Sequence, residues 1–342
     1  MWSVGLDVHQ RMSCICILDE NGKTIKEFEI IGGWTALIAA LGKIKERFAI
    51  CYEASCGYGY LHDQFRQIAS RVVVAHPGET RLIFKSKRKN DRIDARKLAT
   101  LLFLDQVPAV HVPRLDIRSW RRTIEFRQRL IGRRTQFRNG LRCLLRGHGV
   151  ELPAGKSLWT IKGQTWIQKL DLPDETALER DMLLYDMRRL APQIKRVEKI
   201  LKQRADAHPG VMVLKTIPGV GIRTAEAMVA YIDDAKRFSR NKQIGAYFGL
   251  VPCEDTSVKH RLGHITANGP ATVRKLLAEA AWQAIRRDAS VRARFERIHG
   301  GKPDRRKIAI VAIAHYLARV ILAMLRTGES WRKQEPENKK VA

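Results

Sequence analysis

The first third of the chain alternates short apolar runs with turn signals. Residues 3–8 and 12–18 are apolar, and a polar Asn-Gly turn at 20–23 leads into 24–31, where polar and apolar residues alternate. A period of two residues around an Asn-Gly turn is typical of neighbouring strands. The pattern therefore predicts three adjacent antiparallel strands.

The pattern then switches between helix and strand. Apolar residues recur with helical spacing at 34–48, 58–69 and about 90–103, and strand-like runs stand at 49–54 and 71–75. Three antiparallel strands followed by strand–helix alternation are the order of an RNase H-like mixed sheet. We predict an α/β plus α fold whose first domain, 1–113, contains that sheet.

A long cationic helix is expected at 114–146. The segment has no proline, 11 arginines and only two acids, and its apolar residues form two stripes that need a partner helix such as 175–205. We predict a helical coiled-coil region over 114–207. Four arginines recur every fourth residue and align on one face: Arg134, Arg138, Arg142 and Arg146. A solvated face is the alternative, but the shortage of acids favours phosphate contact.

A further, mainly helical domain is expected at 208–328, followed by a charged, flexible tail at 329–342. It contains a Pro-Gly-x-Gly turn within 216–224 that resembles a helix-hairpin-helix motif. Backbone amides around Gly219 and Gly221 would then hold a phosphate without reading sequence. An ordinary glycine-rich turn is the alternative.

The charge balance narrows the class of protein. Lys and Arg number 63 against 35 Asp and Glu, a net charge of +28 in 342 residues. This excess favours a nucleic-acid partner over a membrane surface. The N-terminus resembles no signal or anchor, and His315 and Arg319 interrupt the apolar run 308–325, which suits a buried helix. We expect a cytoplasmic protein with no membrane span.

The cysteines do not change this interpretation. Six are present, without the paired spacing of a zinc site. Cys14 and Cys16 fall on one face of a predicted strand. We expect all six to be reduced packing residues.

Four carboxylates are the strongest chemical signal. Asp7 interrupts an apolar strand, Glu53 ends another, and Asp91 and Asp94 share one face of a predicted helix. In an RNase H-like sheet these positions converge, and oxygen ligands select Mg²⁺ or Mn²⁺. Two such ions stabilise the attacking and leaving oxygens of phosphoryl transfer. A helix cap at Asp91 and a strand-end charge at Glu53 are the alternatives.

A basic loop at 253–264 contains a candidate nucleophile. Ser257 is followed by Lys259, His260 and Arg261, which can stabilise a developing alkoxide and hold a phosphate. From the residues alone, a solvated loop hydroxyl is the better interpretation.

Together these motifs resemble transposases of the insertion-sequence 110 family, in the family's order and over nearly the whole chain. The acidic domain is matched at residues 5–9, 52–55, 89–95 and 98–99, and the C-terminal domain at 217–221, 249–252, 257, 263–265, 269–270 and 274. The family usually has Gly after the serine, where this chain has Val258, and Thr256 is an adjacent fallback.

The resemblance implies a DNA recombinase. Its RuvC-like domain would hold Mg²⁺ through Asp7, Glu53, Asp91 and Asp94, and Ser257 would attack DNA to form a phosphoserine. A structured RNA encoded by the element would pair with target and donor DNA. The protein would act as a homo-oligomer, a dimer or tetramer, in which the acidic cluster and the serine come from different subunits.

Two other functions remain open from the sequence. One is a RuvC-like junction resolvase or nuclease in which metal-activated water attacks and Ser257 is incidental. The other is a non-catalytic basic protein that packages nucleic acid.

Overall fold

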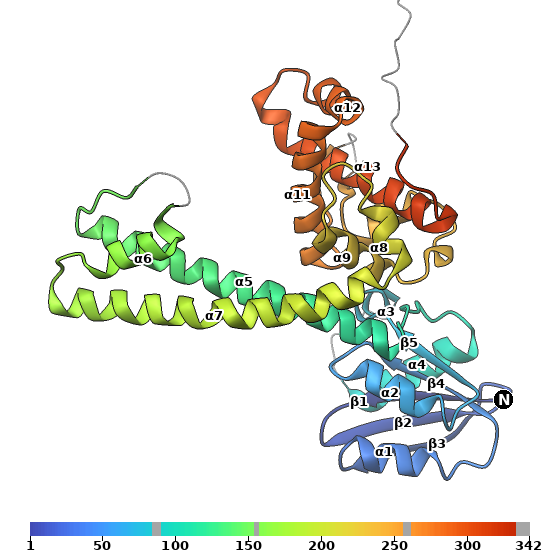
Figure 1. Ribbon diagram of the computed structural model, residues 1–342. Coiled ribbons are helices and arrows are strands. Elements are labelled where there is room, and N and C mark those ends of the chain that lie inside the picture. Colours follow the sequence, from blue (N-terminus) through green and yellow to red (C-terminus); the bar gives the residue numbers. More distant parts are fainter. Residues whose placement is uncertain (84–89, 154–156, 256–260, 333–342) are drawn as a thin grey trace, which may run out of the picture. The chain divides into compact units, whose positions relative to one another are not determined.

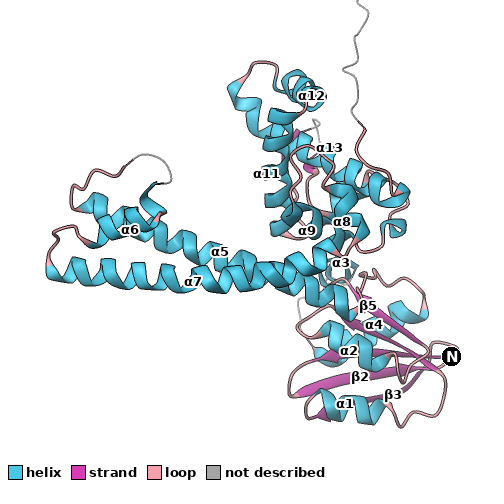
Figure 2. Cartoon of the chain, viewed as in Figure 1, coloured by secondary structure: helices cyan, strands magenta, loops and turns pink. Residues whose placement is uncertain are grey.

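The computed structural model describes residues 1–83, 90–153, 157–255 and 261–332 (Figure 1). The chain forms two compact units, Met1–Arg118 and Ser119–Ala342. The first is a mixed α/β unit, and the second is mainly helical, as Figure 2 shows. The finer division at 113/114, 207/208 and 328/329 stays a prediction.

The first unit is built on a five-stranded mixed sheet in the order β3-β2-β1-β4-β5. β1 pairs antiparallel with β2 and parallel with β4, so the first and fourth strands are neighbours as predicted. The sheet is consistent with an RNase H-like domain. Its strands are β1 (Trp2–Val8), β2 (Met12–Leu18), β3 (Thr24–Ile31), β4 (Phe48–Glu53) and β5 (Arg71–Ala75).

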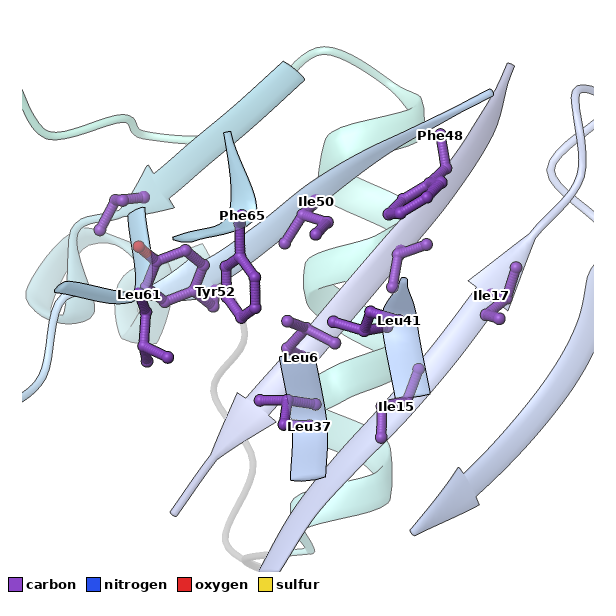
Figure 3. Close-up of a cluster of buried hydrophobic side chains, with 12 residues drawn as sticks. Leu6, Ile15, Ile17, Leu37, Leu41, Phe48, Ile50, Tyr52, Leu61 and Phe65 are labelled. Carbon is purple, nitrogen blue, oxygen red and sulfur yellow. The ribbon is translucent and has the colours of Figure 1, made fainter. Parts of the chain in front are cut away.

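Helices α1 (Trp34–Leu41) and α2 (Tyr58–Phe65) cover one face of this sheet. Their apolar side chains meet Leu6 and Ile15 in the core drawn in Figure 3. The prediction of one helix over 34–48 was wrong at its end. The helix stops before Gly42, and Phe48 starts β4, where it is buried opposite Trp2 of β1.

Helix α4 (Asp91–Phe103) covers the opposite face, and a short helix α3 (Pro77–Ile83) follows β5. Cys14 and Cys16 of β2 pack against Ala95 and Ala99 of α4. The expectation for the cysteines was therefore right for these two. It was wrong for three others, since Cys56, Cys143 and Cys253 are exposed, although all six are free.

The second unit begins with a long helical hairpin, in which α5 (Leu115–Gly147) and α7 (Asp174–Asp206) run antiparallel. Both agree with the predicted helices to within a residue at each end. Leu141 and Leu145 of α5 pack with Leu184 and Met187 of α7. The connection contains a short 3-10 turn η1 (Ser157–Trp159) and α6 (Ile161–Gln168).

The remaining helices form the C-terminal part of the second unit. One two-stranded hairpin, β6 and β7, interrupts them. Their bounds are α8 (Pro209–Leu214), α9 (Ile222–Ile232), η2 (Ala235–Arg237), α10 (Gln243–Tyr247), β6 (Pro252–Asp255), β7 (Arg261–Ile265), α11 (Ala271–Arg287), α12 (Ala289–His299), η3 (Pro303–Arg305) and α13 (Arg306–Thr327).

Helix α13 is the core helix of this part. In the portion of the chain that the structure describes, Pro303–Thr327 is the one segment long and apolar enough to cross a membrane, and half of its apolar window is buried inside the protein. Ile313, Leu317 and Ile321 are fully buried, and the helix packs on α11. The burial agrees with the core helix expected at 308–325.

Candidate metal centre and nucleic-acid interface

Asp7 lies near the end of β1, on the face of the sheet that α4 covers. Val4 and Leu6 point into the opposite core, so the period of two places Gly5 and Asp7 toward α4. The Asp7 side chain is 22% exposed. A partly buried carboxylate at the end of a strand requires partners that stabilise its charge.

Gly5 lets α4 lie against the sheet. A Cβ atom at Gly5 would stand 2.1 Å from the Ala95 carbonyl oxygen and 2.3 Å from the Ala99 nitrogen, so no other residue fits without moving the helix. Two ion pairs join α4 to β3: Arg92 with Glu29 at 2.8 Å, and Arg96 with Glu27 at 2.6 Å. These contacts determine where the first turn of α4 stands relative to Asp7.

The first turn of α4 presents Asp91 and Asp94. Asn90 is the N-cap, and its side chain accepts a hydrogen bond from the Arg92 backbone nitrogen at 3.1 Å. Asp91 is therefore not the cap that the alternative interpretation required. Its Oδ2 atom lies 3.5 Å from Nε2 of His9, and the same nitrogen lies 3.4 Å from Oδ2 of Asp7.

Glu53, the last residue of β4, completes the acidic group. Burial raises its pKa, and the charges of Asp7 and Asp94 raise it further, while Arg81 and Lys97 oppose them. The pKa of Asp7 is also raised, first by burial and then by Asp91 and Asp94, against the effect of His9. The four carboxylates thus lie close enough to repel one another.

Two basic groups beside the acids were not predicted from the sequence. His9 stands between Asp7 and Asp91, and Lys97 Nζ lies 2.9 Å from Asp94 Oδ1. His9 stands two residues after Asp7 and Lys97 three after Asp94. That spacing was the available signal, because Lys97 lies one helical turn after Asp94 on α4 and His9 directly follows the strand that carries Asp7.

The donor set fits a divalent cation. One ligand atom each from Asp7, His9 and Asp91 lie within 4.8 Å of one another. Carboxylate oxygens suit hard ions, and a cation among repelling carboxylates removes the repulsion that raises their pKa values. Lys97 neutralises part of the charge of Asp94.

The Pro-Gly-x-Gly turn joins α8 and α9, and its two glycines differ. Gly219 has φ +92°, and a Cβ atom there would lie 2.5 Å from the Ala284 nitrogen of α11, so this glycine is needed for packing. Gly221 is the N-cap of α9, and a Cβ atom added there would have no described atom of another segment within 4 Å. A cavity of about 560 Å³ beside the turn is lined by Trp282, Arg286 and Arg306, among others.

The β6–β7 hairpin carries the predicted nucleophile. Ser257 and Lys259, like Thr256 and Val258, lie outside the described residues, and Arg261 is the first residue of β7. The base of the hairpin is held by Arg274, whose Nη1 donates to the Asn268 carbonyl at 2.9 Å and to the Gly269 carbonyl at 3.0 Å. The Gly-Leu-Val-Pro and Gly-Pro motifs therefore form a packed frame at the base of the β6–β7 hairpin.

Gly249 allows this frame to close. Its φ is +65°, and a Cβ atom would stand 2.2 Å from the Asn268 carbonyl oxygen. A residue with a side chain would push the two loops apart at the point where the hairpin begins.

An aromatic ring that the sequence analysis did not predict, Trp159 of η1, lies against the arginine face of α5. The guanidinium groups of Arg138 and Arg142 lie 5.1 and 4.9 Å from the Trp159 ring centroid. Burial, together with Arg134 and Arg142, lowers the pKa of Arg138. The Nε atoms of Arg134 and Arg138 are buried without a hydrogen-bond partner. Arg146, one turn further, is exposed.

No acid is paired with these four arginines within the described residues. Cations crowded on one face without acids repel one another, and an anionic ligand would relieve that repulsion. The geometry agrees with the predicted alignment, while phosphate contact itself is a proposal.

The fold is consistent with the RNase H-like domain of a DEDD transposase. A model of the DEDD transposases of the IS110 group matches residues 4–149, and a model described as the transposase IS116/IS110/IS902 family matches residues 211–296. Together they cover more than half of the chain. The chain belongs to the IS110 family of insertion-sequence transposases.

Similar proteins agree with this assignment. A putative transposase of Sinorhizobium fredii is 27% identical over 82% of this chain and 70% of its own length. The transposase for insertion sequence element IS1111A of Coxiella burnetii is 25% identical over 96% and 91%. The transposase for insertion sequence element IS1328 of Yersinia enterocolitica is 26% identical over 83% and 85%.

Proposed function

We propose that this transposase cuts and rejoins DNA with Mg²⁺ or Mn²⁺ held by Asp7, Glu53, Asp91 and Asp94, and with Ser257 as nucleophile. The observation that carries the proposal is that acids from β1, β4 and the first turn of α4 gather at one edge of the sheet. Such an arrangement is costly in a folded protein unless cations offset it. When bound, the ions supply positive charge to the oxygens that attack and leave phosphorus.

The chain's own groups orient the acids. His9 lies between Asp7 and Asp91 and contacts both carboxylates through one nitrogen. Lys97 fixes Asp94 on the same helix. The shape of the cluster is thus set before any ion or substrate arrives, which is what phosphoryl transfer requires.

The serine step is proposed from the family resemblance. The Ser257 oxygen forms a bond to phosphorus, one P–O bond of the strand breaks, and the departing oxygen leaves as a hydroxyl after taking a proton. A strand hydroxyl later reverses this exchange and rejoins the DNA. Support comes from the Arg274 frame, which holds the base of the hairpin that carries the serine.

The decisive experiment is a denaturing gel of the purified protein with labelled donor DNA, guide RNA and Mg²⁺. Wild type and Thr256→Ala should form a covalent protein–DNA adduct, and Ser257→Ala should not. An adduct lost in Thr256→Ala and kept in Ser257→Ala would move the nucleophile by one residue. Cleavage by wild type without any adduct would support the nuclease mechanism instead.

The acidic cluster has its own test in the same assay. Asp7→Asn and Asp94→Asn should bind DNA at least as well as wild type, because each removes one negative charge, but should cleave at least a hundred-fold less. Normal recombination by both variants would show that these carboxylates do not carry the reaction and would contradict the metal mechanism.

We further propose that the arginine face of α5 contacts the phosphates of a structured guide RNA or of DNA. Arginines four residues apart lie about 6 Å apart along the helix, near the spacing of successive phosphates. Omitting the RNA should abolish the choice of site while leaving binding to DNA intact. Unchanged site choice without RNA would remove RNA from the proposal.

We also propose that two copies associate through α7. Leu178, Met182, Tyr185 and Ile200 lie on one face of this helix and are 55–63% exposed. Its first half, residues 174–186, has five acids and one base, and its second half, 187–206, has seven bases and two acids. An antiparallel pair would set opposite charges together around the apolar stripe.

Light scattering can test this pairing. Leu178→Asp with Met182→Asp should convert oligomer to monomer, while Met212→Asp, at a similarly exposed apolar position on α8, should not. An unchanged mass in the double variant would exclude α7 as the interface.

A further inference from the structure

Two aromatic rings stack at the surface of the sheet domain. Trp34, the first residue of α1, and Tyr60, in the first turn of α2, have ring centroids 5.9 Å apart and an interplanar angle of 28°. Tyr60 is half exposed. With Gln10, Arg11 and Thr35, the rings line an open cavity of about 600 Å³.

This cavity lies at the edge of the sheet where the candidate metal ligands stand. Arg11 is in the turn between β1 and β2, and its carbonyl accepts a hydrogen bond from Gly32 at 2.8 Å, just after β3 ends. Trp34 follows that strand end. Tyr60 follows Glu53 after a short loop. Since β1 and β4 are parallel, Glu53 and Asp7 lie at the same edge of the sheet, and Tyr60 stands close to that edge.

The position of the indole is fixed by Gly57, which is in the loop between Glu53 and Tyr60. Gly57 has φ +80°, and a Cβ atom there would lie 2.1 Å from Cη2 of Trp34. The indole nitrogen is buried, with no hydrogen-bond partner among the residues that the structure describes. Packing therefore holds the indole in place, and the Tyr60 ring stacks on a rigid support.

A stacked aromatic pair beside an arginine is the chemistry that recognises an unpaired base. Aromatic rings stack on any nucleobase, and Arg supplies a charge for the adjoining phosphate. A double-stranded region would not offer a base face to these rings, since its bases are already stacked on one another.

We propose that this cavity binds an unpaired nucleobase of the strand being processed, with the base stacked on Tyr60 and its phosphate beside Arg11. The proposal rests on the proposed function, because the cavity lies at the same edge of the sheet as the carboxylate cluster, on the face that α1 and α2 cover. It adds a second role for the sheet domain, which is to keep the strand open at the site of reaction.

The test is binding of short single-stranded oligonucleotides to the full chain in EDTA, where no cleavage occurs. Normal oligonucleotides should bind at least about ten-fold more tightly than the same oligonucleotides with abasic sites. Tyr60→Leu should lose most of that ratio and Tyr60→Phe should keep it. Phe103→Leu, at an exposed aromatic position at the C-terminal end of α4, is the control and should change nothing.

Crosslinking gives the position of the base. Oligonucleotides with 5-iodouracil should crosslink to the peptide that contains Tyr60 or to the one that contains Trp34, and DNA and RNA versions show which strand is bound. Arg11→Gln should weaken normal and abasic oligonucleotides equally and reduce the salt dependence of binding by about one ion.

Two outcomes would overturn the inference: an unchanged ratio in Tyr60→Leu, or crosslinks only outside the sheet domain. Both are measured without metal, so they leave the proposed function standing. Conversely, a Tyr60-dependent ratio together with no cleavage under any condition would contradict the proposed function and not this inference.

Discussion

The carboxylate cluster of the sheet domain and the arginine face of α5 concentrate opposite charges by different means. The cluster collects acids from β1, β4 and α4, so it depends on the tertiary fold and on the close approach at Gly5. The arginine face needs only a four-residue repeat on one helix and the Trp159 ring above it. The first should therefore fail as a whole when its fold is disturbed, and the second should weaken one residue at a time.

The largest expected effect comes from Gly5→Ala. The added methyl group would meet the Ala95 carbonyl oxygen at 2.1 Å, so α4 must move away and carry Asp91 and Asp94 with it. We expect a loss of about 1–3 kcal/mol in unfolding free energy and at least a hundred-fold loss of cleavage. Urea unfolding and the gel assay measure these two quantities.

Gly132→Ala is the matched control, because the added methyl group would have no described atom of another segment within 4 Å. Within α5 this change should stabilise the protein by about 1 kcal/mol. Equal cleavage by Gly5→Ala and Gly132→Ala would show that the spacing of α4 does not set the site.

A buried acid in the second unit shows how a carboxylate behaves outside the acidic cluster. Glu226 of α9 is 1% exposed, and burial raises its pKa to about 7 although Arg223 Nη1 lies 2.8 Å away. The folded protein then holds this proton more tightly than the unfolded chain. The contribution to stability is full below pH 4.5 and is lost as the pH rises through 7.

Glu226→Gln should remove this dependence. Between pH 4.5 and 8 wild type should lose on the order of 3 kcal/mol more than the variant in urea unfolding. Parallel curves for the two proteins would show that folding does not raise the pKa of Glu226.

Metal addition tests the acidic cluster alone. Mg²⁺ at a hundred-fold excess over its dissociation constant should stabilise wild type by about 2.7 kcal/mol, and EDTA should reverse this. Asp7→Asn should respond much less, while Asp116→Asn, an acid outside the cluster, should respond like wild type. A full response in Asp7→Asn would place the ion elsewhere.

The smallest effects are expected on the arginine face. Arg138→Gln and Arg142→Gln should each reduce the salt dependence of nucleic-acid binding by about one ion and weaken binding by about 1 kcal/mol. Trp159→Leu should weaken binding less, since it removes the ring and leaves the charges. If a single substitution abolished binding, the expectation that each arginine contributes a separate, small part of the binding energy would be wrong.

Periodicity predicted most of the fold. The strand order and both long helices follow from apolar spacing, whereas the end of α1 at Leu41 was missed because apolar residues continue at helical spacing into Phe48. The convergence of the four acids followed from the predicted sheet. The contact of His9 with two of them did not, because it depends on how closely α4 approaches the sheet. The contact of Trp159 with the arginines could not be predicted either, since the connection that contains Trp159 has no regular apolar period.

The length of the helical hairpin separates two kinds of contact within the second unit. At one end of α5, Arg121 donates to the Ala230 carbonyl at 2.7 Å, and Glu125 contacts Thr272 of α11 at 2.9 Å. Arg142 stands 17 residues further on, about 26 Å away. The arginine face therefore lies far from the contacts that fix α5 to α9 and α11, and substitutions in it should leave those contacts unchanged.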